Sequence, residues 1–577
     1  MSVTFPEDFN LAQYYLFDRL QDGLGKKTAI RYGEREYTYS QVADRSRALA
    51  RYLISIGVTR EQRIYTVLPD TPPFAWSLFA TLACGGVVAM GNPVAPSENL
   101  AYVLRYSRAA VLVTLPNVAA ALADVLDTCP ELTTVLLVPD TATGDDPEAP
   151  AKVPPELADV DVSVLPLTSA IMVGRDLDLP LAETKRDDVC MWLFTSGSTG
   201  RPKAAVHTHR DFAFNTEVYA KGTVGYRRDD VTVSVPRLYF GYATGTNLLF
   251  PFAVGATSCL FSERPTAHSL ARAIDMYRPT VVTNVPTMMG KLIDFDEVRK
   301  AQGKPPLDMS CVRFHLSAGE ALPPALLERF TQRYENDVYD GIGSAEMFHI
   351  YISNRPDDIR PGSLGKLVEG YQAAILPREA TGPGATPVAT GETGVLWIRG
   401  DSVALCYFQD RDKSWATFHG HWCRTGDLFR VDEQGYYWFS GRADDLFKVS
   451  GIWVAPLEVE ECLMRHKAVG LAAVIPVHQD DLIKPKAFVV LRESARGRAD
   501  SDEQRSALEQ ELKEHVKARL SKHKYPRLIE FVEDLPKNDR GKVDKKHLRV
   551  QEKAKAAAAQ VKTADADADA GPGEGAS

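Results

Sequence analysis

The feature that most constrains the fold is an alternation of helical and strand-like segments near the N-terminus. Residues 39–56 carry apolar side chains at helical spacing. Short apolar runs follow at 63–68, 110–115 and 133–138. This alternation is typical of an α/β architecture with largely parallel strands. Ligands of open α/β sheets bind at the carboxyl ends of the strands, so a site is expected in the loops that follow them.

The chain is too long for a single hydrophobic core. It has 577 residues, of which 45% are hydrophobic and 25% charged, and chains of this length divide into two or more domains. The alternation resumes from about residue 188, with strands expected at 189–195, 280–284 and 311–317. Beyond residue 394, short aromatic or β-branched runs at 394–400 and 435–441 predict a smaller, more antiparallel sheet.

A further compact segment follows the Gly441-Arg442 pair. It contains strand-like runs at 471–476 and 486–491 and a charged helical segment at 501–520. From residue 551 the chain consists mainly of Ala, Asp, Gly and Lys with almost no core-forming residues, which predicts a disordered tail. We therefore expect an N-terminal α/β domain with a small β-barrel-like subdomain, a small α+β domain and a tail, at residues 1–443, 444–550 and 551–577.

Charge and hydropathy argue against several classes of protein. The net charge of −9 argues against nucleic-acid binding, which favours a basic face. The sequence has no run of 18 apolar residues, so no membrane-spanning helix is expected. Its first residues lack the basic-then-apolar pattern of a signal peptide. The eight cysteines form no C-x-x-C pair, which argues against a zinc site. We expect a cytoplasmic protein with reduced thiols.

One loop carries the strongest functional signal, Phe194-Thr-Ser-Gly-Ser-Thr-Gly-Arg-Pro-Lys203. Successive backbone N–H groups in a glycine-rich turn form an anion-binding concavity. The hydroxyl groups add hydrogen-bond donors, and the lysine adds a full positive charge for phosphate. The loop lacks the G-x-x-x-x-G-K-[ST] pattern of a Walker P-loop. Because it follows an expected strand, it predicts a polyphosphate site at the sheet edge.

This loop resembles the phosphate loop of the adenylate-forming superfamily, which includes acyl- and aryl-CoA ligases, luciferases and nonribosomal adenylation domains. Further segments resemble other motifs of this family. The adenine and metal motif resembles Tyr339-Asp-Gly-Ile-Gly-Ser-Ala-Glu346, and the ribose motif resembles Thr425-Gly-Asp427. The hinge resembles Gly441-Arg-Ala-Asp-Asp445, which Lys448-Val-Ser-Gly451 follows, and the C-terminal lysine motif resembles Pro536-Lys-Asn-Asp-Arg-Gly-Lys542. The motifs occur in the family's order, and the resemblance covers about residues 10 to 550.

Other segments are similar to the benzoate–CoA ligase family: Val206-His-Thr-His209, Leu238-Tyr-Phe-Gly-Tyr242, Ser262-Glu-Arg-Pro265 and Glu346-Met-Phe-His-Ile-Tyr-Ile-Ser-Asn-Arg-Pro356. The resemblance implies a ligase that uses ATP and Mg²⁺ to convert a benzoate-like acid to its acyl-CoA thioester through an acyl-adenylate, releasing pyrophosphate and AMP. Three alternatives stay open. They are a short or branched aliphatic acid as substrate, an adenylation enzyme that loads a carrier protein, and a degenerate adenylate-binding protein. Dimers are common among relatives, and the sequence leaves the oligomeric state open.

The resemblance also assigns roles to individual residues. Lys542 would bridge the carboxylate and the α-phosphate, Lys203 would hold phosphates, and Glu346 would bind magnesium. The remaining nucleotide contacts would come from Thr195, Ser196, Gly197, Ser198, Thr199, Gly200, Tyr339, Asp340, Gly341, Asp427 and Arg442. Asp444 would be the hinge about which the C-terminal domain rotates, and Gly451 would line the pantetheine tunnel. The acid pocket would be lined by Gly241, Tyr242, Ala318, Gly319, Gly343, His349 and Ile350.

Two positions depart from the family pattern. Position 345 is alanine, where the family usually has a threonine that donates to a phosphate. Losing such a donor costs on the order of 10²-fold in rate if no other group replaces it. Position 204 is alanine where glycine is usual, so its backbone must avoid torsions that only glycine tolerates well. Neither change removes Lys203, Glu346 or Lys542, so an active enzyme is the leading hypothesis.

Overall fold

The computed structural model describes residues 3–140, 146–196, 201–449, 452–479, 482–537 and 543–555. The chain forms two compact units. The first comprises Met1–Thr425 and Arg430–Phe439, and the second comprises Gly426–Phe429 and Ser440–Ser577. The chain therefore crosses between the units more than once, and the boundary predicted at residue 443 lies close to the last crossing.

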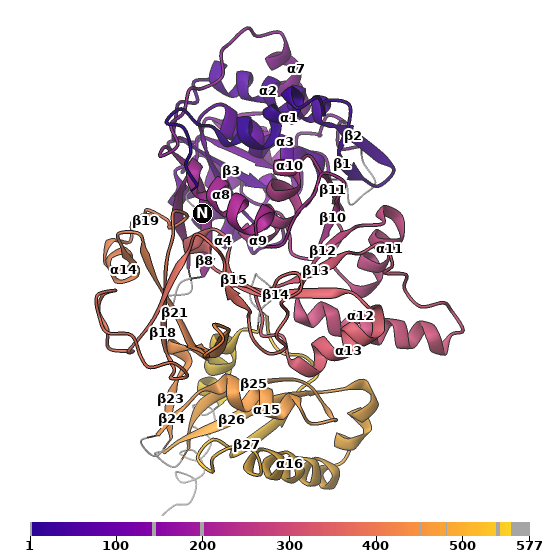
Figure 1. Ribbon diagram of the computed structural model, residues 1–577. Coiled ribbons are helices and arrows are strands. Elements are labelled where there is room, and N and C mark those ends of the chain that lie inside the picture. The colour runs from indigo at the N-terminus through magenta and orange to yellow at the C-terminus, as the bar shows by residue number, and fades with distance from the viewer. Residues whose placement is uncertain are drawn as a thin grey trace, which may run out of the picture. The chain divides into compact units, whose positions relative to one another are not determined.

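Most described strands of the first unit belong to two sheets (Figure 1). The eight-stranded sheet has the order β19-β9-β8-β4-β3-β5-β6-β7. Its strands are β19 (Cys406–Tyr407), β9 (Pro202–Thr208), β8 (Val189–Ser196), β4 (Val87–Met90), β3 (Arg63–Val67), β5 (Val111–Thr114), β6 (Thr134–Leu137) and β7 (Ser163–Pro166). The six strands β8, β4, β3, β5, β6 and β7 pair in parallel with their neighbours in this order, whereas β9 pairs antiparallel with both β8 and β19.

The nine-stranded sheet has the order β16-β15-β14-β13-β12-β10-β11-β1-β2. Its strands are β16 (Lys366–Leu367), β15 (Ile350–Ser353), β14 (Asp337–Gly343), β13 (Phe314–Ser317), β12 (Val281–Asn284), β10 (Val231–Ser234), β11 (Thr257–Leu260), β1 (Thr28–Tyr32) and β2 (Arg35–Thr38). The strands from β14 to β1 pair in parallel, and the strands at both edges pair antiparallel. This arrangement confirms the predicted α/β class.

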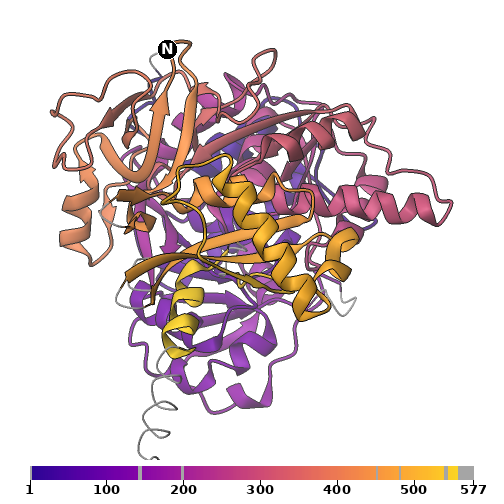
Figure 2. The ribbon, with the colours of Figure 1, turned by 90° about the horizontal axis from the view of Figure 1, so that it is seen from below.

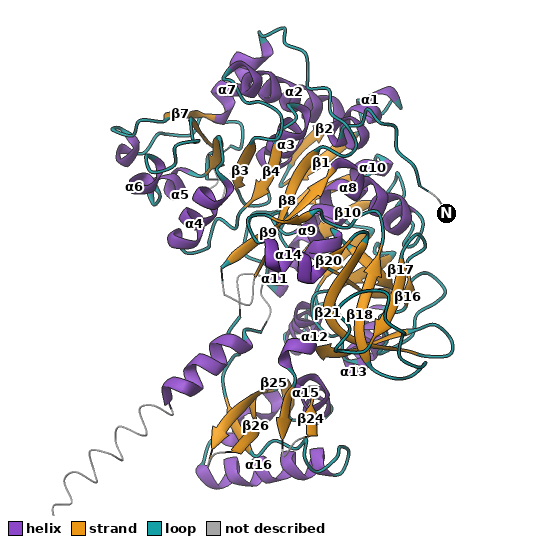
Figure 3. Cartoon of the chain, turned by 90° about the vertical axis from the view of Figure 1, so that its left-hand side faces the viewer, coloured by secondary structure: helices purple, strands orange, loops and turns teal. Residues whose placement is uncertain are grey.

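Helices cover these sheets, and one helix contacts strands of both. In the eight-stranded sheet, α4 (Ser97–Ser107) contacts β3 from one side, and α3 (Pro72–Ala83) contacts it from the other (Figure 3). Every residue of α3 is buried, as expected for a helix that is apolar all round. Its Trp76 packs edge-on against Tyr37 of β2, with ring centroids 5.7 Å apart, so α3 joins the two sheets.

Local signals explain where the helices begin. The helix predicted at 39–56 is α2 (Tyr39–Ser55), whose N-cap Thr38 forms a capping box with Gln41. The other helices of the first unit are α1 (Asp18–Gln21), α5 (Pro116–Ala120), α6 (Ala123–Leu126), α7 (Leu167–Arg175), α8 (His209–Asn215), α9 (Gly241–Thr244), α10 (Phe250–Val254), α11 (Ala267–Tyr277), α12 (Pro286–Ala301), α13 (Pro324–Tyr334) and α14 (Arg411–Thr417). No described helix combines the length and apolar character needed to cross a bilayer.

The smaller sheet predicted beyond residue 394 is present. Its described strands are β17 (Gln372–Leu376), β18 (Gly394–Arg399), β21 (Trp422–Val431), β20 (Phe418–His419) and β22 (Tyr437–Arg442). The β17–β18 and β20–β21 pairs are antiparallel, which agrees with the prediction.

The second unit has a core of its own. Strands β25 (Val469–Gln479), β26 (Leu482–Leu491) and β27 (Leu528–Phe531) form a sheet, beside the hairpin of β23 (Phe447–Val449) and β24 (Ile452–Val454). Helices α15 (Pro456–Met464) and α16 (Asp502–Lys517) pack on the sheet (Figure 2), and Leu508 and Leu512 of α16 join its core. Residues 545–555 are helical, so the first five residues of the tail predicted from 551 form part of a helix. The rest of that tail, 556–577, lies outside the described residues.

Candidate functional site

The predicted phosphate loop connects two antiparallel strands of the eight-stranded sheet. Strand β8 ends at Ser196 and β9 begins at Pro202, and Thr195 lies directly opposite Lys203 in the ladder. The sheet therefore fixes both ends of the loop. The four predicted contacts between these ends, Gly197, Ser198, Thr199 and Gly200, lie outside the described residues.

Ala204 occupies an ordinary strand position at the exit of this loop. Its side chain is buried in a cluster with Trp192 and Val206. Its carbonyl accepts a hydrogen bond from the Phe408 N–H at 3.0 Å, as in a regular ladder. Ala204 is not among the described residues with positive φ, so alanine can replace the family's glycine here without backbone strain.

The structure brings Lys203 and Glu346 together through a residue that the motifs did not identify. The Nζ atom of Lys203 lies 3.5 Å from the centroid of the Tyr407 ring. The hydroxyl of Tyr407 donates a 2.6 Å hydrogen bond to Oε1 of Glu346. Tyr407 lies on the two-residue strand β19, 61 residues beyond Glu346 and outside every motif, so only the tertiary fold could reveal it.

Glu346 is the residue that the family resemblance predicts as the magnesium ligand. It belongs to the 3₁₀ turn η6 (Ala345–Met347) and is partly exposed. Within the described parts of the chain, no group of three or more His, Cys, Asp or Glu side chains could hold a metal. Mg²⁺ keeps several waters and commonly takes one or two protein carboxylates plus phosphate oxygens. A single carboxylate therefore fits an ion that arrives with ATP.

The backbone around Ala345 is held by a buried histidine. Nε2 of His207 lies 2.7 Å from the Ala345 carbonyl oxygen, and Nδ1 lies 2.9 Å from Oδ2 of Asp211. The neighbouring Ser344 hydroxyl oxygen is buried and has no hydrogen-bond partner among the described residues. Sequence reasoning noted the segment that contains His207 but assigned it no role.

The predicted adenine residues lie on β14. The Tyr339 ring is buried and packs against Phe314 with ring centroids 5.0 Å apart, so one face of the ring is already covered. Adenine stacking on Tyr339 stays a prediction. Asp340 pairs with Ser317 of β13 and is also buried. Gly341 cannot be replaced without strain, because an added Cβ would lie 2.8 Å from the carbonyl oxygen of Ile352.

Asp340 is a carboxyl group whose charge is strongly disfavoured. Burial raises its pKa to about 8, although the Ser317 hydroxyl and the Gly341 N–H act in the opposite direction. Its Oδ1 atom is buried and has no hydrogen-bond partner among the described residues. A buried polar atom without a partner is costly, and a ligand that donates a hydrogen bond would relieve this cost. The exocyclic amino group of adenine is such a donor.

Most of the predicted acid-pocket residues lie in contact with one another. Gly343 pairs with Ile350 across β14 and β15. Nε2 of His349 lies 3.0 Å from the Tyr242 carbonyl oxygen, and the two rings lie 5.3 Å apart. An added Cβ on Gly241 would lie 3.5 Å from the carbonyl oxygen of Phe348. The remaining two residues, Ala318 and Gly319, directly follow β13, one strand away from β14.

His349 contributes an aromatic and uncharged side chain to the predicted acid pocket. Burial lowers the pKa of His349 to about 3, so its imidazole is neutral at physiological pH. Nε2 then carries the proton donated to the Tyr242 carbonyl, and Nδ1 is an acceptor with no partner among the described residues. The ring is surrounded by those of Tyr219, Tyr242 and Phe250.

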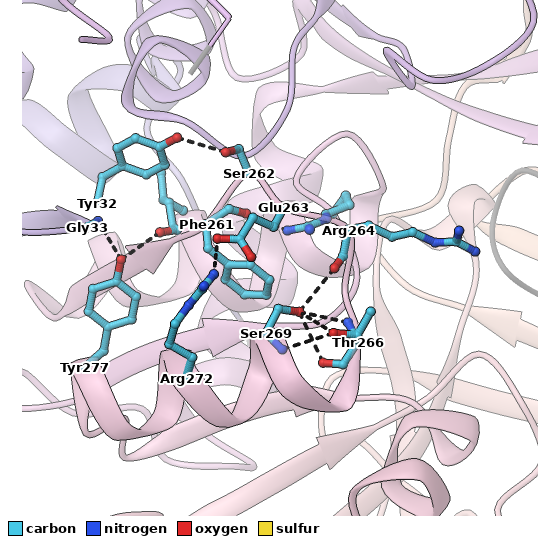
Figure 4. Close-up of polar contacts among 12 residues, drawn as sticks. Tyr32, Gly33, Phe261, Ser262, Glu263, Arg264, Thr266, Ser269, Arg272 and Tyr277 are labelled. Atoms are coloured by element: carbon cyan, nitrogen blue, oxygen red, sulfur yellow. Dashed lines mark hydrogen bonds and ion pairs between the residues drawn. The ribbon is translucent and has the colours of Figure 1, made fainter. Parts of the chain in front are cut away.

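The stretch Ser262-Glu-Arg-Pro265 follows β11 and is held by hydrogen bonds and an ion pair (Figure 4). Tyr32 and Ser262 share a 2.9 Å hydrogen bond between hydroxyls, and Glu263 forms an ion pair with Arg272. The Ser269 hydroxyl donates to the Arg264 carbonyl at 3.1 Å. These contacts fix the turn at the carboxyl end of a parallel strand, where ligands of such sheets bind.

In the second unit, the ribose motif meets the hinge motif. Nη1 of Arg442 lies 2.8 Å from Oδ1 of Asp427, which forms an ion pair. Gly426, which precedes Asp427, has a φ of +75°, and an added Cβ would lie 3.1 Å from Arg442 Nη2. Asp444 is exposed in the turn η7 (Ala443–Asp445). The two other residues predicted in this unit, Gly451 and Lys542, lie outside the described residues.

Comparison with known proteins agrees with these observations. The family model described as "AMP-binding enzyme" matches residues 17–408, and that described as "AMP-binding enzyme C-terminal domain" matches 458–542. A benzoate–CoA ligase of Thauera aromatica is 36% identical, over 95% of this chain and 97% of that protein. A 4-hydroxybenzoate–CoA/benzoate–CoA ligase of Rhodopseudomonas palustris is also 36% identical, over 94% of each.

Solved structures show the same similarity. The crystal structure of an anthranilate CoA ligase in complex with anthranoyl-AMP superposes with a TM-score of 0.84 at 32% identity, covering 96% of this chain and 99% of that one. A benzoate CoA ligase from Burkholderia xenovorans LB400 superposes with a TM-score of 0.79 at 34% identity, covering 94% and 100%. The superfamily resemblance and the fold class predicted from the sequence are thus confirmed.

Proposed function

The chain belongs to the AMP-binding enzyme family, and from this premise we propose that it is an ATP-dependent ligase that joins an aromatic carboxylic acid to coenzyme A. The structural observation that carries the proposal is the grouping of Lys203, Tyr407 and Glu346. It combines a cation suited to phosphate with a carboxylate suited to magnesium, beside a loop that is rich in backbone and hydroxyl donors. The near-full-length similarity to benzoate–CoA ligases supports the aromatic substrate.

In the first step, a carboxylate oxygen of the acid attacks the α-phosphorus of ATP, and the bond from this phosphorus to the bridging oxygen breaks to release pyrophosphate. Both reactants are anions, so the site needs cations placed where charge accumulates. We assign phosphate binding to Lys203 and the loop hydroxyls. We assign to Lys542 the contact that bridges the carboxylate and the α-phosphate. Mg²⁺ held by Glu346 would supply further charge neutralisation at the phosphates.

In the second step, the CoA thiolate attacks the carbonyl carbon of the acyl-adenylate, and the carbon–oxygen bond to AMP breaks. The family resemblance suggests that the C-terminal domain turns about Asp444 between the steps and brings Gly451 to the pantetheine arm. Asp427 suits the ribose, because its two acceptor oxygens match two neighbouring hydroxyls. Its ion pair with Arg442 holds this carboxylate in place.

The pocket residues support an aromatic acid over an acid with a second charge. His349 is neutral at physiological pH because it is buried, and the rings around it present flat apolar faces. Gly241 and Gly343 add no side chain beside these rings, and a Cβ at Gly343 would lie 2.3 Å from the His349 carbonyl oxygen. A planar apolar ring suits such surroundings, and its carboxylate must extend toward the phosphate loop for the first step.

A panel of acids tests the proposal. Benzoate, 4-hydroxybenzoate, anthranilate, phenylacetate and isobutyrate are each incubated with ATP and Mg²⁺, with and without CoA, while pyrophosphate and thioester are measured. We expect pyrophosphate release with the benzoates and thioester only when CoA is present. Lys203→Met removes the phosphate-binding cation and should abolish turnover, whereas Lys413→Met removes an exposed lysine and should leave it unchanged.

The other outcomes separate the alternatives. Turnover with isobutyrate alone would indicate an aliphatic acid ligase. Pyrophosphate release without any thioester would indicate an enzyme that loads a carrier protein. The absence of turnover with every acid would contradict the enzyme proposal and favour an adenylate-binding protein, for which Ala345 is the motivating departure.

A further inference from the structure

We propose that Tyr407 is a positioning residue for the first half-reaction, holding the Lys203 ammonium and the Glu346 carboxylate in the arrangement that receives ATP with its metal. The inference rests on the proposed function, because it concerns the same site. Its basis is that one side chain contacts both groups. The ring face receives the ammonium, with Nζ 3.5 Å from the centroid, and the hydroxyl donates to the carboxylate over 2.6 Å.

Tyr407 is itself held firmly. Its backbone pairs with Ala205 of β9, the strand that also carries Lys203. Its N–H donates to the Ser414 hydroxyl at 2.9 Å, and its ring packs against Phe418 with centroids 5.0 Å apart. Only 4% of the residue is exposed. The direction of the side chain is therefore set by the surrounding fold.

The segment before Tyr407 ties the turn that carries Glu346 to the strand that carries Lys203. The Ala404 N–H donates to the Glu346 carbonyl oxygen at 2.8 Å. The next N–H, of Leu405, donates to the carbonyl oxygen of Val206 on β9 at 2.9 Å. Residues 404–407 thus form a bridge between the two motifs, and Tyr407 is the member of this bridge whose side chain contacts both functional groups.

The chemistry of the tyrosine suits this role better than a direct ion pair between Lys203 and Glu346 would. Opposite charges in a partly buried site attract strongly, and phosphate and metal would have to break such a pair before binding. A cation–π contact is weaker, so phosphate oxygens can displace the ring from the ammonium.

Two substitutions separate the two contacts. Tyr407→Phe keeps the ring and removes the donor to Glu346, and Tyr407→Leu removes both contacts. Tyr436→Phe is the matched control, because the Tyr436 hydroxyl also donates to a carboxylate, that of Asp358, outside the proposed site. Titration calorimetry measures ATP affinity in EDTA and at a series of Mg²⁺ concentrations, and thermal melting checks that each variant is folded.

For Tyr407→Phe we expect the ATP affinity in EDTA to be unchanged. The Mg²⁺ concentration that gives half of the maximal increase in ATP affinity should rise about tenfold, because hydrogen bonds to charged groups are strong. For Tyr407→Leu we expect an additional loss of about threefold to tenfold in ATP affinity in EDTA, because the ammonium loses its orienting ring. The half-saturating acid concentration should stay within about twofold of wild type in both. A magnesium response of Tyr407→Phe equal to that of wild type or of Tyr436→Phe would overturn the inference.

A double-mutant cycle makes the test independent of stability. If Tyr407 acts through Glu346, adding Tyr407→Phe to Glu346→Gln should change the Mg²⁺ dependence by less than twofold, because the contact is already impaired. Full additivity would show that Tyr407 acts elsewhere and would refute the role. The proposed function fails separately: wild-type protein that binds ATP but releases no pyrophosphate with any acid would refute the ligase and still allow this cycle to be measured.

Discussion

The protonation state of Asp340 predicts how ATP binding should depend on pH. In the nucleotide-free protein, burial raises the pKa of this carboxyl group to about 8, so most molecules carry a neutral Asp340 at pH 7. An adenine amino group that donates to Asp340 favours the charged carboxylate and lowers this pKa. ATP binding should therefore release a proton, and affinity should rise as the pH increases through 8.

The magnitude follows from the fraction of protein that is already ionised. With a pKa of about 8, roughly one-tenth of the molecules carry the carboxylate at pH 7, and nearly all carry it at pH 9. Binding that requires the carboxylate is then about tenfold weaker at pH 7 than at pH 9, which corresponds to about 1.4 kcal/mol. Below pH 7 the affinity should fall by a further factor of ten for each pH unit.

Titration calorimetry from pH 7 to 9 at saturating Mg²⁺ measures this dependence, and buffers of different ionisation enthalpy count the released protons. At pH 7 wild-type protein should release close to one proton per ATP bound. Asp340→Asn keeps an acceptor oxygen but cannot ionise, so its affinity should be flat apart from the titration of ATP itself. A flat wild-type profile, or an equal slope in Asp340→Asn, would refute the assignment of Asp340 as the charged acceptor.

Three further predictions concern other parts of the site. Lys542→Ala should lower adenylation by at least about 10²-fold and leave thioester formation from a supplied acyl-adenylate within about threefold of wild type; equal losses in both half-reactions would contradict a role confined to the first step. Ala345→Thr should raise the adenylation rate about tenfold in single-turnover assays by restoring a donor, whereas no change would indicate that another donor already serves, such as the Ser344 hydroxyl, which has no hydrogen-bond partner among the described residues. Gly343→Ala should lower both the melting temperature and acid turnover, because its Cβ would lie 2.3 Å from the His349 carbonyl oxygen, whereas Gly290→Ala, whose nearest neighbour would be 3.9 Å away, should be neutral or stabilising.

Much of the local structure could be predicted because it depends on short-range patterns. Apolar runs of four to six residues became buried strands such as β5 and β12, and helical spacing after Thr38 became α2. The tail was predicted less well, since residues 551–555 are helical. Their side chains show why. Glu552 pairs with the nearly buried Lys486 and Lys555 pairs with Glu530, and such ion pairs between distant segments leave no periodic signal in a charged sequence.

The sequence by itself determined the chemistry that the site can perform. It contains a glycine- and hydroxyl-rich loop that ends in Lys203, followed by carboxylates and a second lysine in a fixed order. These side-chain types indicate phosphate and adenylate chemistry, because that chemistry needs them whatever their positions in the chain. Only the tertiary structure decided which groups meet. Tyr407 lies 61 residues from Glu346 in sequence and hydrogen-bonds to it, and the charge of Asp340 depends on its burial in a strand that pairs with both β13 and β15. Contacts and burial are properties of packing, and the order of residues does not display them.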